Sequence, residues 1–320
     1  MTSPFTSLFA KQMNNMLQYK EALGYSRSSY YKFLWNFDEF CIQYFPEESV
    51  LTQKLVMEWG RKRTGENING VKRRLIAIRE FGKHLNSVDI MAYVIPSEMI
   101  GSFKPFTPYI FTDLELSAFF QATDNIPAHK LSPLREITAP VLFRLLYCCG
   151  LRPNEIRNIK CCNINLNTGE LYINETKMHK DRTIVIAKDV LTLCNRYDDQ
   201  VKIIYMDREY FFQSPNGNAY TANWIQNIFW KCWNIAGIDN FYGSRPRVSD
   251  FRHNYATRTL QKWLDEDRDL YVYLPYLSAY MGHSNFSETA YYIHLLPERL
   301  INSAGINWDK FDALIPEVKL

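Results

Sequence analysis

Three residues in the last third of the chain have the types and spacing needed to attack a phosphodiester. They are Arg252, His283 and Tyr292, and Tyr292 lies nine residues after His283. A second arginine, Arg152, precedes them. Attack on a phosphate builds negative charge on its non-bridging oxygens, and the permanently charged, planar fork of arginine binds such oxygens bidentately. Two arginines can therefore clamp the phosphate while the tyrosine hydroxyl attacks it.

A tyrosine nucleophile has consequences for cofactors. A phenol has an ordinary pKa of about 10, so Tyr292 must lose its proton within the site. A covalent phosphotyrosine keeps the energy of the broken bond for rejoining, and the reaction then needs neither ATP nor a metal ion. The sequence contains no P-loop and no carboxylate cluster, and its seven cysteines form no CxxC pair. We therefore expect no cofactor, and free thiols in place of a zinc site.

The order of these motifs resembles the tyrosine recombinase (phage integrase) family. The matching segments are GLRPNEI at 150–156, SDFRHNYAT at 249–257 and MGHSNFSETAYYIH at 281–294. The resemblance covers roughly residues 140–300. It implies a site-specific recombinase that cuts and rejoins DNA strands through a covalent 3′-phosphotyrosine intermediate, with Tyr292 as the nucleophile.

The resemblance also assigns the other roles. In the family, a lysine on a β-hairpin turn protonates the leaving 5′-oxygen as general acid. Lys177, 25 residues after the first arginine, matches this lysine best, and Lys180 is the alternative. His283 would donate to the phosphate or orient the nucleophile. Tyr291 competes with Tyr292 by adjacency, but on a helix it would point about 100° away, and the nine-residue spacing selects Tyr292.

One position departs from the family pattern. The family usually carries a histidine three residues before the second arginine, and Ser249 stands there in this chain. A hydroxyl can hydrogen-bond a phosphate oxygen, but it does not accept a proton at neutral pH. His253 and His294 lie nearby in the sequence, but neither follows as a substitute. We expect active but slowed cleavage, and the alternative is a catalytically impaired DNA-binding protein of the same fold.

Local sequence rules predict the elements that position these residues. Gly150 is expected to end a helix, and Pro153 suits the first turn of the next one. Arg152 would then lie at a helix N-terminus, where backbone N–H groups favour an anion. Two strand-like runs at 170–175 and 182–187 flank a polar turn and predict a β-hairpin whose turn carries the lysine. The chain is expected to be helical again from about residue 248.

Residues 1–100 are predicted to form a four-helix bundle, with its third and fourth helices near 52–63 and 68–85. The segment 54–83 carries nine Lys and Arg against three Glu, a balance of +6 in a chain whose net charge is +3. Such an asymmetry suits contact with phosphates, although a solvated helical face is the alternative. The residues expected to contact DNA are Arg61, Lys62, Arg63, Lys72, Arg73, Arg74, Arg79 and Lys83.

The whole chain, 320 residues with 47% hydrophobic side chains, suits two domains. We expect a mainly α fold with a small antiparallel β-sheet. By resemblance it divides into a SAM-like core-binding domain (1–100), a linker (101–112), a mixed α/β catalytic domain (113–300) and a C-terminal tail (301–320). No apolar run approaches the roughly 20 residues of a membrane span. The N-terminus lacks the features of a secretion signal, so we expect a cytoplasmic protein encoded by a bacterium, phage or mobile element.

The resemblance implies double-stranded DNA as the partner, held by a homo-oligomer that ranges from dimer to tetramer. It further implies that the tail docks on a neighbouring protomer, with a frayed terminus as the alternative. The expected role is integration or excision of a mobile element. The same chemistry serves a chromosome-dimer resolvase and, less well matched, a type IB topoisomerase-like enzyme. The sequence leaves open the target DNA site and any accessory DNA-binding proteins.

Overall fold

The computed structural model describes residues 5–103, 107–174, 181–238, 245–283 and 285–295. The chain forms two compact units, Met1–Phe106 and Thr107–Leu320. Each unit has a hydrophobic core of its own. The described residues are mostly helical and contain one two-stranded antiparallel sheet, which confirms the predicted fold class. No described helix is long and apolar enough to cross a membrane.

The first unit is a helical bundle built around α4. Helix α4 contacts each of the three helices before it. Phe37 of α2 packs edge to face on Trp59 of α3. Phe9, just before α1, packs in the same way on Phe81 of α4. Aromatic contacts therefore link the helices in pairs. The predicted third and fourth helices are confirmed to within a few residues. The helices are α1 (Ala10–Ala22), α2 (Ser28–Tyr44), α3 (Gln53–Gly60), α4 (Ile68–Ser87) and the short α5 (Ser97–Ile100).

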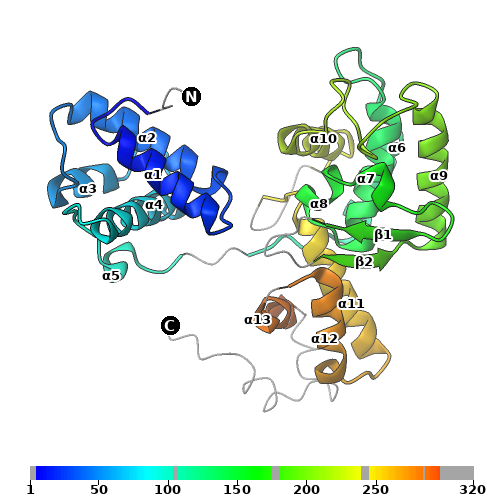
Figure 1. The fold of residues 1–320 in the computed structure, drawn as a ribbon. Coiled ribbons are helices and arrows are strands. Elements are labelled where there is room, and N and C mark those ends of the chain that lie inside the picture. Colours follow the sequence, from blue (N-terminus) through cyan, green and yellow to red (C-terminus); the bar gives the residue numbers. More distant parts are fainter. Residues whose placement is uncertain (1–4, 104–106, 175–180, 239–244, 284, 296–320) are drawn as a thin grey trace. The chain divides into compact units, whose positions relative to one another are not determined.

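The second unit is built around α7, which contacts α6, α9 and α11 (Figure 1). Phe143 of α7 is fully buried and packs against Phe229 of α10 and Phe251 of α11. This core fixes α11, which carries Arg252, against α7, which ends three residues before Arg152. The helices are α6 (Asp113–Asp124), α7 (Arg135–Cys149), α9 (Lys188–Lys202), α10 (Ala222–Ile235) and α11 (Asp250–Asp265).

Part of the segment interpreted as a linker belongs to the second unit. Tyr109 and Phe111 are buried in its core, where both rings contact Trp233. Thr112 and Glu115 then form a capping box that begins α6. The boundary between the two units therefore falls inside 101–112, and the second half of that segment anchors the start of the second unit.

The predicted β-hairpin is confirmed. Strands β1 (Glu170–Ile173) and β2 (Arg182–Val185) pair antiparallel, with Ile173 opposite Arg182. Leu171, Ile173 and Ile184 face the core, whereas Tyr172 and Val185 are exposed, so the alternation in the sequence reflects one buried face. Residues 175–180, where a turn with Lys177 and Lys180 is predicted, lie outside the described residues.

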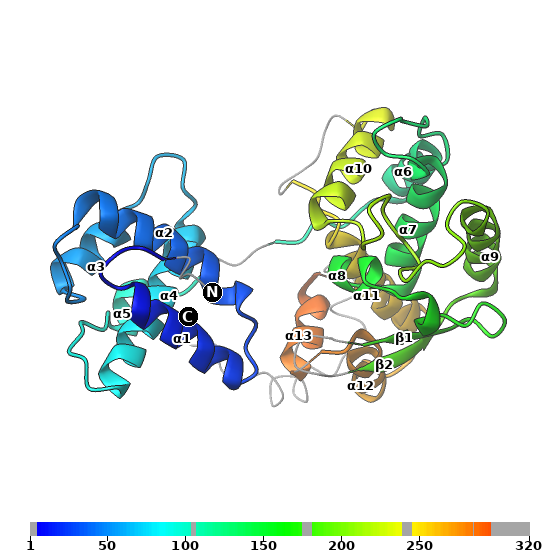
Figure 2. The same ribbon diagram turned by 45° about the horizontal axis from the view of Figure 1, so that its top comes forward.

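The end of the described chain forms a small second core. Leu260 of α11 packs with Leu274, Leu277 and Tyr292 in one cluster of buried residues. Helices α12 and α13 lie side by side (Figure 2), and α11 contacts the final helical turn. Tyr292 is therefore anchored in a cluster of buried residues. The elements are α12 (Leu270–Met281), α13 (Phe286–Ala290) and the 3-10 helix η2 (Tyr291–Leu295).

Candidate active site

Arg252 is buried and held entirely by uncharged groups. Its side chain is 6% exposed, and its guanidinium donates to the carbonyl of Gly150 at 2.8 Å and to the carbonyl of Met281. Among the described residues, no carboxylate pairs with it. Burial, together with the positive charge of Arg152, lowers the pKa of Arg252 to about 10. The side chain therefore stays charged at neutral pH, with its charge uncompensated, and can bind an anion.

The carbonyl that holds Arg252 depends on the glycine that ends α7. Gly150 has φ +59°, and a Cβ at this position would lie 2.6 Å from the Tyr255 ring. Only glycine meets both conditions without strain. The prediction that Gly150 ends a helix is confirmed. Its second role, as acceptor for the Arg252 guanidinium 102 residues away, follows only from the fold.

Arg152 lies at the N-cap of α8 (Pro153–Arg157), which confirms its predicted position at a helix start. Its guanidinium donates to Glu155 at 2.8 Å and to the carbonyl of Gly282 at 3.1 Å. Its side chain remains 31% exposed. The guanidinium is therefore fixed on one side and open to a ligand on the other.

Glu155 organises the positive charges of the site. Its two carboxylate oxygens accept from Arg182 of β2 at 2.9 and 3.1 Å and from Arg152. Burial raises the pKa of Glu155, but the hydrogen bonds and charges of Arg182 and Arg152 outweigh burial and lower it to about 2. Arg182 also donates to the carbonyl of Tyr280 at 2.7 Å, which ties the hairpin to α12.

Sequence reasoning missed both residues of this pair as parts of the site. Glu155 lies within the motif at 150–156 and Arg182 begins the strand-like run at 182–187, but the sequence patterns assign neither of them a role in the site. The sequence pattern of α8 could have suggested the bond from Glu155 to Arg152, three residues earlier. No local pattern links Glu155 to Arg182, which lies 27 residues later.

His283 follows Gly282, which ends α12 with φ +63°. The ring is buried, and its Nδ1 lies 2.6 Å from the hydroxyl of Thr289. Burial and the charges of Arg252 and Arg152 lower the pKa of His283 to about 3. The ring is therefore neutral at pH 7, so it contributes a hydrogen bond to the site and no charge.

Tyr292 lies at the centre of these groups. It is 4% exposed, and its ring stacks on His283 with ring centroids 5.9 Å apart. Burial raises the pKa of Tyr292, and a hydrogen bond and charge from Arg252 partly offset that effect. The neighbouring Tyr291 is 38% exposed, and its ring centroid lies 6.1 Å from that of Tyr292. Of the two, only Tyr292 is held against the arginines.

Ser249 and His253 complete the site. Ser249 is the N-cap residue of α11, although its side chain makes no capping hydrogen bond. His253 lies one helical turn further on, and its ring centroid lies 5.6 Å from that of Tyr292. Sequence reasoning named His253 only as a nearby histidine, whereas the structure places its ring against the tyrosine.

One cleft of about 690 Å³ joins these side chains. It brings together five of the predicted site residues, which come from α8, α11, α12 and η2 and from positions up to 140 residues apart. The sixth, Lys177, lies outside the described residues together with Lys180. No group of three or more His, Cys, Asp or Glu able to hold a metal ion occurs in the described part of the chain. The residues lining the cleft are Arg152, Pro153, Asn154, Ser249, Arg252, His253, His283, Glu288, Tyr291 and Tyr292.

Comparison with known protein families shows which family the chain belongs to. The model of the phage integrase family matches residues 111–299, and this range contains all the residues of the cleft. The chain belongs to the phage integrase family. Its members are DNA breaking and rejoining enzymes, and the resemblance drawn from the motifs is confirmed.

Individual proteins that are similar to this chain support the same family assignment. The putative integrase/recombinase y4rE of Sinorhizobium fredii is 31% identical over 58% of this chain and 59% of its own length. The putative integrase/recombinase y4rB of the same organism is 25% identical over 91% of this chain and 94% of its own length. A crystal structure of a lambda integrase (75–356) dimer bound to a COC′ core site covers 88% of this chain and 94% of that chain. Its TM-score is 0.65 at 13% identity, so this likeness concerns the fold.

The predicted DNA contacts in the first unit need correction at Arg74. Arg74 is only 4% exposed, and it donates to both oxygens of Glu66 at 2.8 and 2.9 Å and to the Arg61 carbonyl at 2.7 Å. Its guanidinium also lies over the ring of Trp59, 4.9 Å from the centroid. Arg74 is therefore a buried and paired residue in the core of the first unit, which argues against a contact with DNA.

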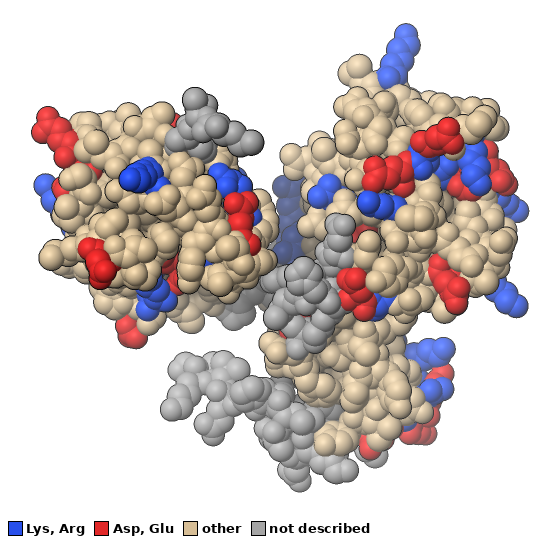
Figure 3. All heavy atoms as spheres, in the orientation of Figure 1, with Lys and Arg blue, Asp and Glu red and all other residues tan. Residues whose placement is uncertain are grey.

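The other basic side chains of this segment differ in exposure. Arg79 donates to the carbonyl of Ile95 at 2.9 Å, and Lys72 donates to the carbonyl of Ser102. Figure 3 shows Lys and Arg side chains interspersed with Asp and Glu on the visible face of each unit. Contact with DNA remains a prediction for the half-buried Lys72 and Arg79 and for the exposed Arg61, Lys62, Arg63, Arg73 and Lys83.

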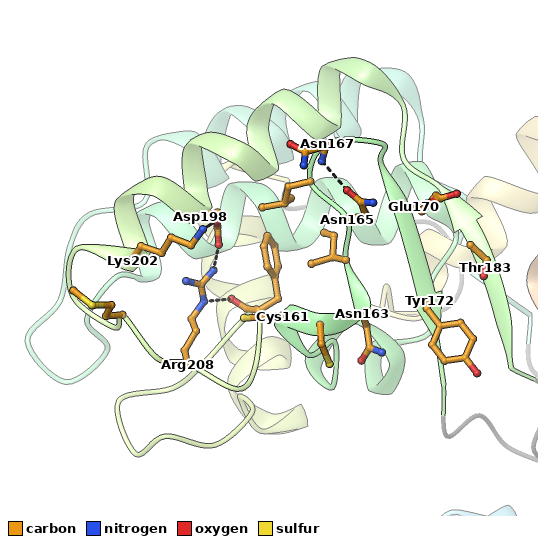
Figure 4. Close-up of a pocket in the computed structure, with 15 residues that line it drawn as sticks. Cys161, Asn163, Asn165, Asn167, Glu170, Tyr172, Thr183, Asp198, Lys202 and Arg208 are labelled. Carbon is orange, nitrogen blue, oxygen red and sulfur yellow. Dashed lines mark hydrogen bonds and ion pairs between the residues drawn. The ribbon is translucent and has the colours of Figure 1, made fainter.

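A second cleft of about 680 Å³ lies beside the hairpin and contains none of the predicted site residues (Figure 4). Buried Asp198 of α9 pairs there with Arg208 and, at 2.6 Å, with Lys202. Arg208 also donates to the carbonyl of Phe211 at 3.3 Å. These bonds tie the end of α9 to the segment that follows it, so the charged residues in this cleft have a structural role.

Proposed function

We propose that the chain is a site-specific DNA recombinase that cuts and rejoins strands through a 3′-phosphotyrosine at Tyr292. One observation carries the proposal: the buried charge of Arg252 has no carboxylate partner among the described residues and lies beside the buried Tyr292 hydroxyl. An uncompensated buried charge is costly to a fold. Its position beside a nucleophile is explained by an anionic substrate that completes the site.

In this proposal the two arginines bind the scissile phosphate. Arg152 approaches from its open side, and Arg252 approaches from the floor of the cleft. Neutral His283 adds an N–H donor. Because all three are held by carbonyls, Glu155 or Thr289, they are oriented before the substrate arrives. Such preorganisation favours the transition state, in which the phosphate oxygens carry additional charge.

The chemical step exchanges one phosphate ester for another. The Tyr292 oxygen attacks phosphorus, the bond from phosphorus to the 5′-oxygen breaks, and Tyr292 gives up its proton. The leaving 5′-oxygen takes a proton from a general acid, for which the family resemblance proposes Lys177, with Lys180 as the alternative. Rejoining runs these transfers backwards with a 5′-hydroxyl as the nucleophile.

We further propose that double-stranded DNA is bound by dimers that assemble into tetramers. The similarity of fold to the lambda integrase dimer on its core site supports this. Residues 1–100 would grip one side of the duplex, 101–112 would link the units, and 113–300 would carry out the chemistry. The tail at 301–320, outside the described residues, would dock on a neighbouring protomer. Deleting 305–320 should then weaken assembly on DNA more than it weakens binding of one protomer to one site.

Integration or excision of a mobile element is the biological role that we propose. The two Sinorhizobium fredii relatives carry the description "putative integrase/recombinase", which supports it. Resolution of chromosome dimers uses the same chemistry. The two roles differ in the DNA that is recombined, so footprinting on the ends of the DNA element that surrounds the gene discriminates between them.

A nicked suicide DNA substrate tests the chemistry. Its sequence would come from a random pool enriched by binding to the full chain. We expect a covalent protein–DNA adduct that Tyr292→Phe abolishes and that persists in the matched variant Tyr291→Phe. An adduct that is lost in Tyr291→Phe and kept in Tyr292→Phe contradicts the assignment of the nucleophile.

Ser249 favours a second candidate, a DNA-binding protein with impaired catalysis. In that case the chain would bind the selected DNA and form no adduct within hours. Introducing the family's usual residue by Ser249→His would then create adduct formation where the unaltered chain has none.

A further inference from the structure

The replacement of the usual histidine by Ser249 raises the question of where the proton of Tyr292 goes. Ser249 precedes the first turn of α11, and its hydroxyl is not a proton acceptor at neutral pH. Residues four apart on a helix lie on the same face. The residue four positions after Ser249 is His253, and both side chains line the active-site cleft. A histidine is thus present on the same face of the helix, one turn along.

We propose that His253 is the general base that accepts the proton of Tyr292 during cleavage, a role that rests on the proposed function. Its ring centroid lies 5.6 Å from that of Tyr292, so the two rings are in contact. The other histidine against the tyrosine, His283, has its Nδ1 engaged with the Thr289 hydroxyl. The proposed function uses the N–H of His283 as a donor to the phosphate, so we assign the proton of Tyr292 to His253.

The surroundings of His253 indicate which of its ring nitrogens carries the proton. Its Nε2 lies 3.9 Å from the buried Asp250 carboxylate. Its Nδ1 is buried and makes no hydrogen bond to any residue that the structure describes. A neutral imidazole donates from one nitrogen and accepts at the other. A proton on Nε2, toward Asp250, leaves Nδ1 as the acceptor.

Burial and the charges around the ring keep His253 unprotonated at neutral pH before the tyrosine gives up its proton. Burial and the positive charges of Arg247 and Arg252 lower the pKa of His253 to about 4. Arg247 also pairs with Asp250, with an N–O distance of 3.0 Å. A bound phosphodiester is negative and opposes the effect of Arg252, so it raises the pKa of His253 toward its ordinary value. The base therefore becomes stronger when the phosphate is in place.

With His253 as the base, every proton in the cleavage step has a donor and an acceptor. The proton leaves the Tyr292 oxygen for His253 as that oxygen bonds to phosphorus and the 5′-oxygen leaves. The 5′-oxygen receives its proton separately, from the general acid of the proposed mechanism. On rejoining, His253 returns its proton to the tyrosine oxygen. No oxidant, reductant or further reactant takes part.

Single-turnover cleavage of the suicide substrate tests this role in the full chain. General base catalysis contributes about 10²–10⁴-fold, so His253→Gln should slow cleavage by at least about 100-fold. His253→Phe, which keeps a ring for packing, should be equally slow. Adding Ser249→His to His253→Gln should restore at least about tenfold, because it returns a base to the position that the family uses. DNA binding should stay within about twofold in each variant.

A substrate with sulfur in place of the leaving 5′-oxygen separates the base from the acid. Sulfur leaves without taking a proton, so this substrate should remove the defect of Lys177→Ala and leave that of His253→Gln unchanged. Four results overturn the proposal: His253→Phe cleaving within about threefold of the unaltered chain, a His253→Gln defect that the sulfur substrate removes, a defect that Ser249→His fails to reduce, or DNA binding that falls in parallel with cleavage. Absence of any adduct from the unaltered chain overturns the proposed function as well, whereas a fast His253→Gln variant overturns this inference alone.

Discussion

Two buried arginines, one in each unit, show how differently the same side chain is used. Arg74 is 4% exposed and Arg252 is 6% exposed. Arg74 donates to both oxygens of a carboxylate, Glu66, and lies over the Trp59 ring. Arg252 donates to two carbonyls and, within the described residues, has no carboxylate partner. The first charge is neutralised inside the protein, whereas the second has no such partner among the described residues.

The difference separates structural from functional burial of charge. A buried ion pair satisfies both partners, and removing one of them exposes the cost of burying the other. An arginine held only by carbonyls is oriented but not neutralised. Burial of such a group is expected where an anion binds, because the electrostatic attraction is strong in a site that excludes water.

The largest expected effect is that of Arg252→Met on catalysis. We expect cleavage of the suicide substrate to slow by about 10²–10³-fold, because one transition-state donor is lost. The free energy of unfolding should change by less than about 1 kcal/mol, since relief from burying an unpaired charge offsets the two lost hydrogen bonds. Rapid-quench cleavage and urea denaturation measure the two quantities. A loss of stability with cleavage retained would show that Arg252 is a structural residue, as Arg74 is.

Glu155→Gln should give the next largest effect, and it should depend on pH. The pKa of Glu155 in the fold, about 2, lies below its ordinary value of 4.5. Ionised Glu155 therefore stabilises the fold above about pH 4.5, and this stabilisation is lost as the pH falls through about 2. The difference in unfolding free energy from the unaltered chain is expected to be on the order of 3 kcal/mol at pH 7. Urea denaturation between pH 3 and 7 should show the difference shrinking toward acid, and a constant difference contradicts the assignment.

Arg74→Met should act on stability alone. It leaves Glu66, whose side chain is 19% exposed, and the Arg61 carbonyl without their partner. We expect the free energy of unfolding to fall by about 2 kcal/mol. The cleavage rate at saturating DNA, measured at a temperature where the variant is folded, should match the unaltered chain. A cleavage defect as large as that of Arg252→Met would place Arg74 in the DNA-binding machinery after all.

The smallest expected effect concerns the exposed neighbour of Arg74. Arg73→Gln removes one exposed positive charge from α4. If Arg73 contacts a phosphate, affinity should fall several-fold, and the slope of log binding constant against log salt should decrease in magnitude by about one. Arg74→Met, changed at the adjacent position, serves as the control with an unaltered slope. An unchanged slope in Arg73→Gln removes it from the predicted contacts.

Much of the local structure could be predicted because short-range rules govern it. Gly150 ends a helix, Pro153 begins the next one, and alternating residues form the hairpin at β1 and β2. Each depends on the conformational limits of one residue or on a repeat of two. The spacing of His283 and Tyr292 was equally informative, because a short helix and a turn separate them.

Other features could not be predicted, because they depend on which distant side chains meet. Arg73 and Arg74 are adjacent and chemically identical, yet one is exposed and the other is buried against Glu66. The pairing of Glu155 with Arg182 joins a helix start to a strand 27 residues later. Helical periodicity identifies the apolar face of a helix, but it does not say which charged residues of distant segments meet each other.

The sequence by itself determined the family of this protein, through two arginines, a histidine and a tyrosine in a particular order. Residue type and spacing carry that information because phosphate recognition and nucleophilic attack demand particular functional groups. Tertiary structure alone decided how those groups are charged and paired. It left Arg252 without a carboxylate among the described residues, neutralised Arg74, and placed His253 against Tyr292. Burial and proximity set pKa values and charge, and both arise only when distant segments pack together.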